Sequence, residues 1–117
     1  MEETPVNFFF NDDVPWEELG DGIRRKIIGH TPHLMSVLIE FDKDAIGTPH
    51  SHDEHDQIAF VLKGSFEANI NGEVRILKEG DSFIAPRNHL HGVVALEDKS
   101  RLIDQFSPRR EDYLSAK

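Results

Sequence analysis

Histidine side chains cluster at two places in the chain, and their spacing suggests a metal site. His50 and His52 lie two residues apart, and Gln57 opens the next apolar segment. Alternate residues of an extended strand point to the same side, so His50 and His52 could bind one ion together. His91 begins a later apolar segment. Three imidazoles and one carboxamide suit a divalent first-row transition metal, and this set alone does not choose among Ni, Zn, Mn, Fe and Co.

Each histidine also has a more ordinary interpretation. A lone histidine is more often a solvated loop residue than a ligand, because metal sites are rarer than ordinary surface positions. The His-x-His pair favours the metal, since two ligands at strand spacing already form half of a site. His55 and His89 stand close to the candidate ligands in the sequence, and for both the expected state is a solvated side chain. A plain surface role is also expected for Arg87.

The composition of the 117-residue chain excludes several other kinds of chemistry. It contains no cysteine, which excludes disulfides, thiolate-bound zinc, iron–sulfur clusters and cysteine nucleophiles. The 13 Lys and Arg against 22 Asp and Glu give a net charge of −9, which argues against a nucleic-acid or anionic-membrane partner. The N-terminus is acidic and no apolar run approaches the length of a membrane span, so a cytoplasmic protein is expected.

Segments with strand character follow one another along the chain and predict an all-β fold in a single domain. They cover residues 23–28, 34–41, 57–62, 65–70, 73–77, 81–85, 91–96 and 101–106. Asn71-Gly72 is a strong hairpin signal, because both residues tolerate the positive φ of a type I′ turn. Helical signals are limited to one turn at 16–19 and a short tail helix at 109–116. Phe8-Phe9-Phe10 could add a strand that packs on the sheet or crosses to a second subunit.

The segment 101–106 places an acid among apolar side chains. As a strand it puts Leu102, Asp104 and Phe106 on one face, and this face is the better candidate for the interior. An inward carboxylate needs a partner, a metal ion or a catalytic role, because burial of an unpaired charge is unfavourable. The simpler alternative is an edge-strand aspartate that reaches water or pairs with an arginine.

Two stretches of the chain carry the motif spacing of a known family. The first, at 47–64, holds the His-x-His pair, a polar residue and a closing glycine; the second, at 80–95, holds a glycine, a proline and a histidine. The matching residues are His50, His52, Gln57, Gly64, Gly80, Pro86 and His91. In these residues the chain resembles the cupin superfamily. The resemblance implies a double-stranded β-helix, or jelly-roll barrel, formed by residues 1–117, with the metal ligands His50, His52, Gln57 and His91 pointing inward.

The chain departs from the cupin pattern at four positions. Asp44 stands where the first motif opens with glycine, and Asn88 and Ala95 replace the middle glycine and the closing asparagine of the second. The usual glutamate ligand is Gln57. A neutral ligand leaves a bound metal one unit more positive, which favours an anionic substrate and Lewis-acid chemistry. It also removes the carboxylate of the facial triad that is associated with non-haem iron oxygenases.

The end of the chain narrows the resemblance. Residues 104–112 read Asp-x-Phe-Ser-Pro-x-Arg-Glu-Asp and are similar to a segment of the pectin-degradation cupins of the KdgF type. This resemblance implies an isomerase-type or lyase-type enzyme that linearises 4,5-unsaturated uronates released by pectin and alginate lyases. It also implies a catalytic group of Asp104, Phe106 and Arg110. The acid would move a proton, the ring would pack on the sugar, and the arginine fork would bind the uronate carboxylate.

Other functions stay open at this point. A cupin can also be a dioxygenase or an isomerase of another small molecule, or a non-catalytic module that binds a small sugar or acid. The chain has no basic helix-turn-helix segment, which argues against a self-contained transcription factor. Cupins of this size commonly dimerise, so the resemblance implies a homodimer that acts on a small anionic sugar acid.

Overall fold

The structure is built almost entirely from short antiparallel strands. The computed structural model describes residues 6–114. The strands are β1 (Glu17–Gly20), β2 (Ile23–Thr31), β3 (Leu34–Phe41), β4 (Ile46–His50), β5 (Asp56–Lys63), β6 (Ser65–Ile70), β7 (Glu73–Lys78), β8 (Ser82–Ala85), β9 (His91–Ala95) and β10 (Ser100–Ser107). A 3₁₀ turn, η1 (Asn11–Asp13), precedes them and a short helix, α1 (Glu111–Leu114), follows.

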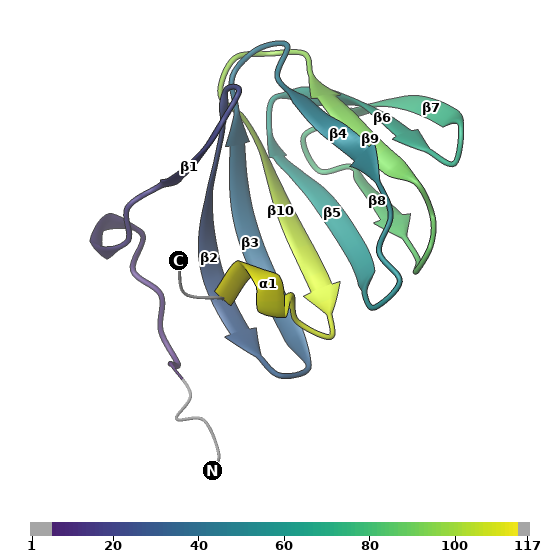
Figure 1. The fold of residues 1–117 in the computed structure, drawn as a ribbon. Coiled ribbons are helices and arrows are strands. Elements are labelled where there is room, and N and C mark those ends of the chain that lie inside the picture. Colours follow the sequence, from purple (N-terminus) through teal and green to yellow (C-terminus); the bar gives the residue numbers. More distant parts are fainter. Residues whose placement is uncertain (1–5, 115–117) are drawn as a thin grey trace.

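Two sheets form the body of the molecule (Figure 1). The larger has six strands in the order β1-β2-β3-β10-β5-β8, and the smaller has four in the order β4-β9-β6-β7. Strands far apart in the sequence pair with one another, because β10 lies between β3 and β5 and β9 lies between β4 and β6. This crossed pairing of two sheets is the jelly-roll arrangement that the motif resemblance implied.

The alternation of side chains decides which face of each strand turns inward. On β10, Leu102, Asp104 and Phe106 are buried, as the sequence pattern predicted for this segment. On the neighbouring β5, Gln57, Ala59 and Val61 are buried while Ile58 and Phe60 between them are exposed. Adjacent strands therefore present Asp104 and Gln57 to the same interior, since successive residues of a strand point to opposite faces.

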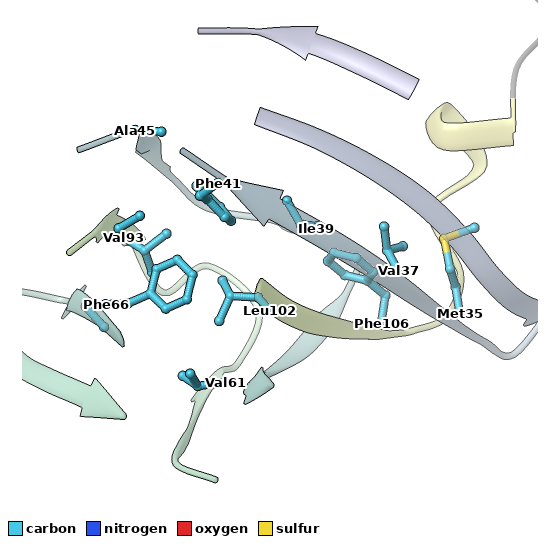
Figure 2. Packing of buried hydrophobic residues seen from close by; sticks show 12 residues of the cluster. Met35, Val37, Ile39, Phe41, Ala45, Val61, Phe66, Val93, Leu102 and Phe106 are labelled. Carbon is cyan, nitrogen blue, oxygen red and sulfur yellow. The ribbon is translucent and has the colours of Figure 1, made fainter. Parts of the chain in front are cut away.

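The apolar core fills the space between the two sheets (Figure 2). Phe41 from β3 and Phe66 from β6 meet edge to face, with ring centroids 5.1 Å apart. Val61 and Leu102 belong to the same buried cluster. Burial of one phenylalanine contributes about 1.5–3 kcal/mol, so this pair is a substantial link between the sheets. The core thus fixes the separation of the two sheets whose strands carry the candidate ligands.

Two turns show why particular residues stand in them. Asn71 and Gly72 join β6 to β7 with φ of 50° and 91°, which confirms the predicted type I′ hairpin. Gly64 separates β5 from β6 with a φ of 76°, and a Cβ at this position would collide with the side chain of Ser100. The glycine that closes the first motif is therefore required both by backbone conformation and by space.

The structure corrects two expectations about local elements. Residues 17–20 form β1 rather than a helical turn, because Glu17 and Glu18 pair across the strands with Arg25 and Arg24 of β2. Opposite charges on facing strands stabilise the pairing even though the segment has no apolar alternation. The second correction is the strand β4, which the sequence patterns did not predict. Four of its five residues are exposed, and it pairs along one side with β9.

Helices are confined to short segments near the two ends of the described range. The expected tail helix at 109–116 is observed over Glu111–Leu114, and residues 115 and 116 lie outside the described residues. Phe8-Phe9-Phe10 forms no strand; Phe8 and Phe10 are exposed and stack on each other, with centroids 6.4 Å apart. Between residues 6 and 114, no helix is long and apolar enough to cross a membrane.

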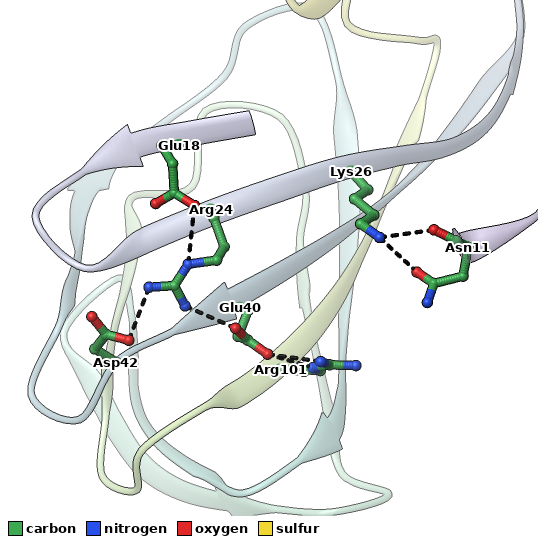
Figure 3. Close-up of polar contacts among 7 residues, drawn as sticks. All are labelled: Asn11, Glu18, Arg24, Lys26, Glu40, Asp42 and Arg101. Carbon is green, nitrogen blue, oxygen red and sulfur yellow. Dashed lines mark hydrogen bonds and ion pairs between the residues drawn. The ribbon is translucent and has the colours of Figure 1, made fainter. Parts of the chain in front are cut away.

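Ion pairs on the outer face of the six-stranded sheet connect β2, β3 and β10 (Figure 3). Arg24 donates to Glu40 at 2.8 Å and to Asp42 at 2.9 Å, and Arg101 donates to the second oxygen of Glu40 at 2.8 Å. Glu40 stands directly opposite Arg24 and Arg101 in the strand register. The ion pairs thus favour the register that turns Asp104 inward, since a slip by one residue would break them.

Candidate metal centre and substrate cavity

The strand pairing of the smaller sheet brings two distant histidines together. His50 ends β4 and His91 begins β9, and the two residues are direct partners in the antiparallel register. Their ring centroids lie 4.5 Å apart. The residues are separated by 41 positions in the chain, so neighbouring positions in the sheet, and not sequence spacing, create this contact.

His52 joins the pair from the segment after β4. Its ring centroid lies 4.7 Å from that of His50 and 5.3 Å from that of His91. The candidate ligand nitrogens of the three histidines all lie within 4.8 Å of one another. β4 ends at His50, so His52 lies outside the strand. The strand alternation that predicted a shared direction for the two side chains therefore does not explain the position of His52. The three rings nevertheless gather at one point.

Backbone carbonyls fix the orientation of two of the imidazoles. The Nδ1 of His50 lies 2.7 Å from the carbonyl oxygen of Thr48, and the Nδ1 of His91 lies 2.9 Å from that of His89. A carbonyl oxygen only accepts, so each Nδ1 must donate its proton, which leaves the lone pair on Nε2. This is the arrangement by which ligating histidines are normally held for a metal ion.

Four buried polar atoms of the described residues have no hydrogen-bond partner, and all belong to this site. They are Nε2 of His52, Oε1 of Gln57, Nε2 of His91 and Oδ1 of Asp104. Buried polar side-chain atoms are nearly always bonded, so such a group calls for a ligand. With the exposed His50, three imidazole nitrogens and one amide oxygen form a set that fits a divalent transition metal.

The electrostatics of the site favour neutral imidazoles. Burial, together with the positive charge of Arg110, lowers the pKa of His52 from 6.5 to about 4. Burial also lowers the pKa of His91, although its hydrogen bond to the carbonyl of His89 acts in the opposite direction. Both rings are therefore unprotonated at neutral pH, which is the form that binds a metal.

Asp104 lies beside the candidate ligand Gln57 on the neighbouring strand. Gln57 of β5 is opposite Phe106 of β10, so Asp104 is its diagonal neighbour on the same inner face. The carboxylate is 7% exposed. Burial raises its pKa from 3.8 to about 7, and hydrogen bonding with Gln57 and the charge of Arg110 only partly offset that rise. Asp104 can thus both accept and donate a proton near neutral pH.

Arg110 reaches the site from the segment between β10 and α1. Its guanidinium carbon lies 5.2 Å from the ring centroid of Phe106 and 4.1 Å from that of Tyr113. Asp112 binds the edge formed by Nε and Nη2, at 3.0 and 2.7 Å, and Nη1 donates to the Tyr113 hydroxyl at 3.0 Å. Asp112 therefore occupies one of the two edges of the guanidinium that can bind a carboxylate, and one N–H each of Nη1 and Nη2 is left.

One cavity of about 210 Å³ joins these groups between the sheets. Its wall includes three of the four candidate ligands and the three residues of the C-terminal motif, together with two residues that sequence reasoning did not single out. These lining residues are His50, Gln57, His91, Asp104, Phe106, Arg110, Arg25 and Tyr113. The volume is below that of pockets for drug-sized ligands and corresponds to a small molecule. For Arg25 a signal was available, since it interrupts an apolar alternation between Ile23 and Ile27.

Comparison with known proteins agrees with this geometry. A family model described as Cupin domain matches residues 37–103, which is more than half of the chain and includes the whole of both motifs. The chain belongs to the cupin family. As a cupin it keeps the backbone of the motifs where their sequence departs: Asp44 and Asn88, which replace glycines, have φ of 69° and 68°. Aspartate and asparagine adopt this left-handed conformation more readily than other non-glycine residues.

Among cupins, several relatives cover nearly the whole chain. It is 61% identical over 107 residues to "Pectin degradation protein KdgF" of Dickeya dadantii, covering 92% of this chain and 97% of that protein. The solved structure of KdgF from Halomonas sp. is 51% identical with a TM-score of 0.91, covering 92% of this chain and 98% of that one. An RmlC-like cupin from Shewanella frigidimarina is 39% identical with a TM-score of 0.88, covering 97% and 99%. This cupin is therefore a member of the KdgF family.

Three further residues near the centre were expected to be plain surface groups. In this cupin His55 is buried, and its Nδ1 lies 3.0 Å from the carbonyl oxygen of Pro108, so the expectation of a solvated ring is wrong. His89 is half-buried and takes part through its carbonyl, which accepts from His91. Arg87 is exposed, as expected, and its backbone N–H donates to Asp56.

Proposed function

We propose that this cupin linearises 4,5-unsaturated uronates with the help of a divalent metal ion. The observation that carries the proposal is one small cavity lined by His50, His91, Gln57, Asp104, Phe106 and Arg110, with His52 clustered beside the other two histidines and Phe106. The family relation to proteins named for pectin degradation gives the substrate class. The net reaction is an isomerisation: the bond between C1 and the ring oxygen breaks, and the resulting enol becomes a ketone.

His50, His52, Gln57 and His91 would hold the metal. When bound there, the ion supplies Lewis-acid polarisation of a substrate oxygen. Ni, Zn, Mn, Fe and Co all accept such nitrogen and oxygen donors, so the choice depends on availability as well as on the ligands. Gln57 contributes no charge, and imidazoles bind metal ions in their neutral form, so the full positive charge of the ion would act on the substrate.

Asp104 is the residue for proton transfer. Ketonisation adds a proton to C4 and removes one from the enol oxygen, while ring opening removes one from the C1 hydroxyl. A carboxyl group with a pKa of about 7 can carry out both kinds of step near neutral pH. Its Oδ1 lacks a protein partner and is therefore available to the substrate.

Phe106 and Arg110 would bind and stabilise the reacting sugar. The Phe106 ring lines the cavity next to His52, with centroids 5.9 Å apart, where it can pack against a sugar ring. Arg110 carries a positive charge close enough to lower the pKa of Asp104, so it would also stabilise negative charge on the developing enolate oxygen.

The test is the ultraviolet absorbance of the substrate double bond in lyase-generated monomer. We expect metal-loaded protein to accelerate its loss well above the spontaneous rate, and chelated protein to lose this activity. No acceleration by the metal-loaded protein would refute the enzyme and leave a ligand-binding cupin. Oxygen consumption during turnover would instead indicate a dioxygenase, which the replacement of the usual glutamate by Gln57 disfavours.

The homodimer and the cytoplasmic location remain predictions. The outer face of the six-stranded sheet exposes apolar side chains of β5, namely Ile58, Phe60 and Leu62, and also Ile84 of β8. A contiguous apolar surface of this kind is typical of protein interfaces, which supports a second copy as the partner. Light scattering of the purified protein measures the oligomeric state directly.

A further inference from the structure

Arg25 is a charged residue at an inward position of β2. Ile23 and Ile27, two positions before and after it, both pack against the apolar core. Arg24 and Lys26, its direct neighbours, make their contacts with Glu40 and with Asn11 (Figure 3). Arg25 itself is 9% exposed. An arginine in this position needs partners in the interior, because an unpaired buried charge is unfavourable.

The side chain of Arg25 lines the cavity that three of the candidate metal ligands and Asp104 also line. Its guanidinium carbon lies 3.8 Å from the ring centroid of Tyr113, and that of Arg110 lies 4.1 Å from the same centroid. Two guanidinium groups thus meet at one aromatic ring. Each of them is paired with a more exposed carboxylate, Arg25 with Glu17 and Arg110 with Asp112.

The two arginines differ in how many of their N–H donors are already used in hydrogen bonds. Arg110 uses Nε and Nη2 for Asp112 and Nη1 for the Tyr113 hydroxyl. Arg25 uses Nε and Nη2 for Glu17, at 2.9 and 3.5 Å, and its Nη1 makes no hydrogen bond to any described residue. A guanidinium has five N–H donors in a fixed plane, so Arg25 keeps donors for a ligand.

We propose that Arg25 binds the carboxylate of the sugar acid in this cavity, while Tyr113 holds Arg25 and Arg110 in place. The inference rests on the proposed function, which supplies the uronate as the ligand class. Charge-assisted hydrogen bonds from a guanidinium recognise a carboxylate strongly and directionally. A site built for that group rejects a neutral analogue, because the N–H donors of Arg25 that Glu17 does not use are then left unpaired. Arg25 is therefore the residue that selects acidic over neutral sugars.

Binding measurements separate this role from a purely structural one. Titration calorimetry compares D-galacturonate with D-galactose, which replaces the carboxylate by a hydroxymethyl group, on the metal-loaded protein. We expect the wild type to prefer the acid at least tenfold. Arg25→Met should lower the affinity for the acid by about 10- to 100-fold, the loss expected for hydrogen bonds to a charged group. Affinity for galactose should change less than about threefold, and Arg25→Lys should recover part of the loss.

Two matched variants control for the fold. Arg24→Met removes a charge from the adjacent residue on the opposite face, and it should leave the acid preference unchanged. Glu17→Gln removes the acidic partner of Arg25 but keeps the arginine, so the preference should persist. If Arg25 served only to tie β1 to β2, Glu17→Gln and Arg25→Met would have the same effect on binding.

The outcomes distinguish this inference from the proposed function. An acid preference that survives in Arg25→Met, or a wild type that does not prefer the acid, overturns the role of Arg25. Preference lost in Arg25→Met without any turnover of unsaturated uronate supports the anion site and refutes the enzyme. Where turnover is present, Arg25→Met should raise KM for the uronate with kcat changed by only a few-fold.

Discussion

Two buried carboxylates on neighbouring strands of the same sheet have opposite electrostatic properties. Glu40 of β3 lies on the outer face and Asp104 of β10 on the inner face; they are 5% and 7% exposed. Burial alone would raise the pKa of Glu40, but hydrogen bonds from Arg101 and Arg24 outweigh it and hold the pKa below the ordinary 4.5. Burial dominates at Asp104, where it raises the pKa to about 7.

The two carboxylates therefore have different roles in one sheet: Glu40 contributes to stability, and Asp104 is available for function. Both oxygens of Glu40 accept hydrogen bonds from guanidinium groups on the adjacent strands, so its burial is compensated. Asp104 has one oxygen without a partner, and three atoms of the candidate ligands beside it share this condition. Polar groups left unpaired inside a folded protein lower its stability. Such groups are usually found where they bind a ligand or take part in a reaction.

The largest expected effect comes from removing one of the candidate metal ligands that share with Asp104 a buried atom without a partner. His91→Ala should lose bound metal and reduce uronate turnover to the spontaneous rate, because His91 is the most buried of the three clustered imidazoles. Elemental analysis gives the metal content, and loss of the double-bond absorbance gives the activity. His33→Ala, at an exposed histidine, is the control. Full metal content in His91→Ala would show that the centre lies elsewhere.

Asp104→Asn tests the inner carboxylate itself. The amide keeps the shape but cannot exchange the proton, so kcat should fall by about 10²- to 10⁴-fold. The free energy of unfolding should stay the same or rise, since a buried and incompletely paired acid is removed. Activity assays and urea denaturation measure the two quantities. A variant with normal kcat would show that Asp104 is only structural.

Glu40→Gln is the matching change on the outer face and should have the reverse pattern. It leaves Arg24 and Arg101 without their shared carboxylate and should lower the free energy of unfolding by about 2–3 kcal/mol. Turnover at ambient temperature should be unchanged, because Glu40 does not line the cavity. A loss of kcat without a loss of stability would contradict the division between the two faces.

The pH dependence of stability provides a second test of Glu40→Gln. The pKa of Glu40 is lower in the fold than its ordinary value of 4.5, so its stabilising effect is present above that pH and disappears as the pH falls through the folded value. Wild-type protein should therefore lose more stability between neutral and acidic pH than Glu40→Gln. Denaturant unfolding at a series of pH values measures this, and parallel curves would show that Glu40 is not stabilised by its ion pairs.

The smallest effect is expected at His55, which contacts Phe106 and Pro108 of the C-terminal motif. His55→Phe keeps an aromatic ring against Phe106 but removes the hydrogen bond to the Pro108 carbonyl, with an expected loss of about 1 kcal/mol of stability. Arg110 follows two residues after Pro108, so kcat should fall a few-fold while metal content stays normal. Loss of the metal instead would identify His55 as a ligand.

Local patterns in the sequence were sufficient for much of the fold. The β-branched and aromatic segments predicted most strands within a few residues, and Asn71-Gly72 predicted its hairpin. Alternation placed Asp104 inside, as the structure shows. β1 and β4 were missed because their residues are mostly exposed and carry no apolar alternation. Their pairing depends on partners elsewhere, namely Arg24 and Arg25 for β1 and the strand β9 for β4.

The sequence by itself determined the chemical character of the site. Histidines and Gln57 in the two motifs provide candidate metal donors, and period-two alternation directs Asp104 and Phe106 inward, because both properties depend only on residue type and nearest neighbours. The tertiary structure alone decided which of these groups meet. His50 faces His91 through the β4–β9 register, and Arg25 meets Arg110 at Tyr113, because strands distant in the chain are brought together only when the sheets close on their common core.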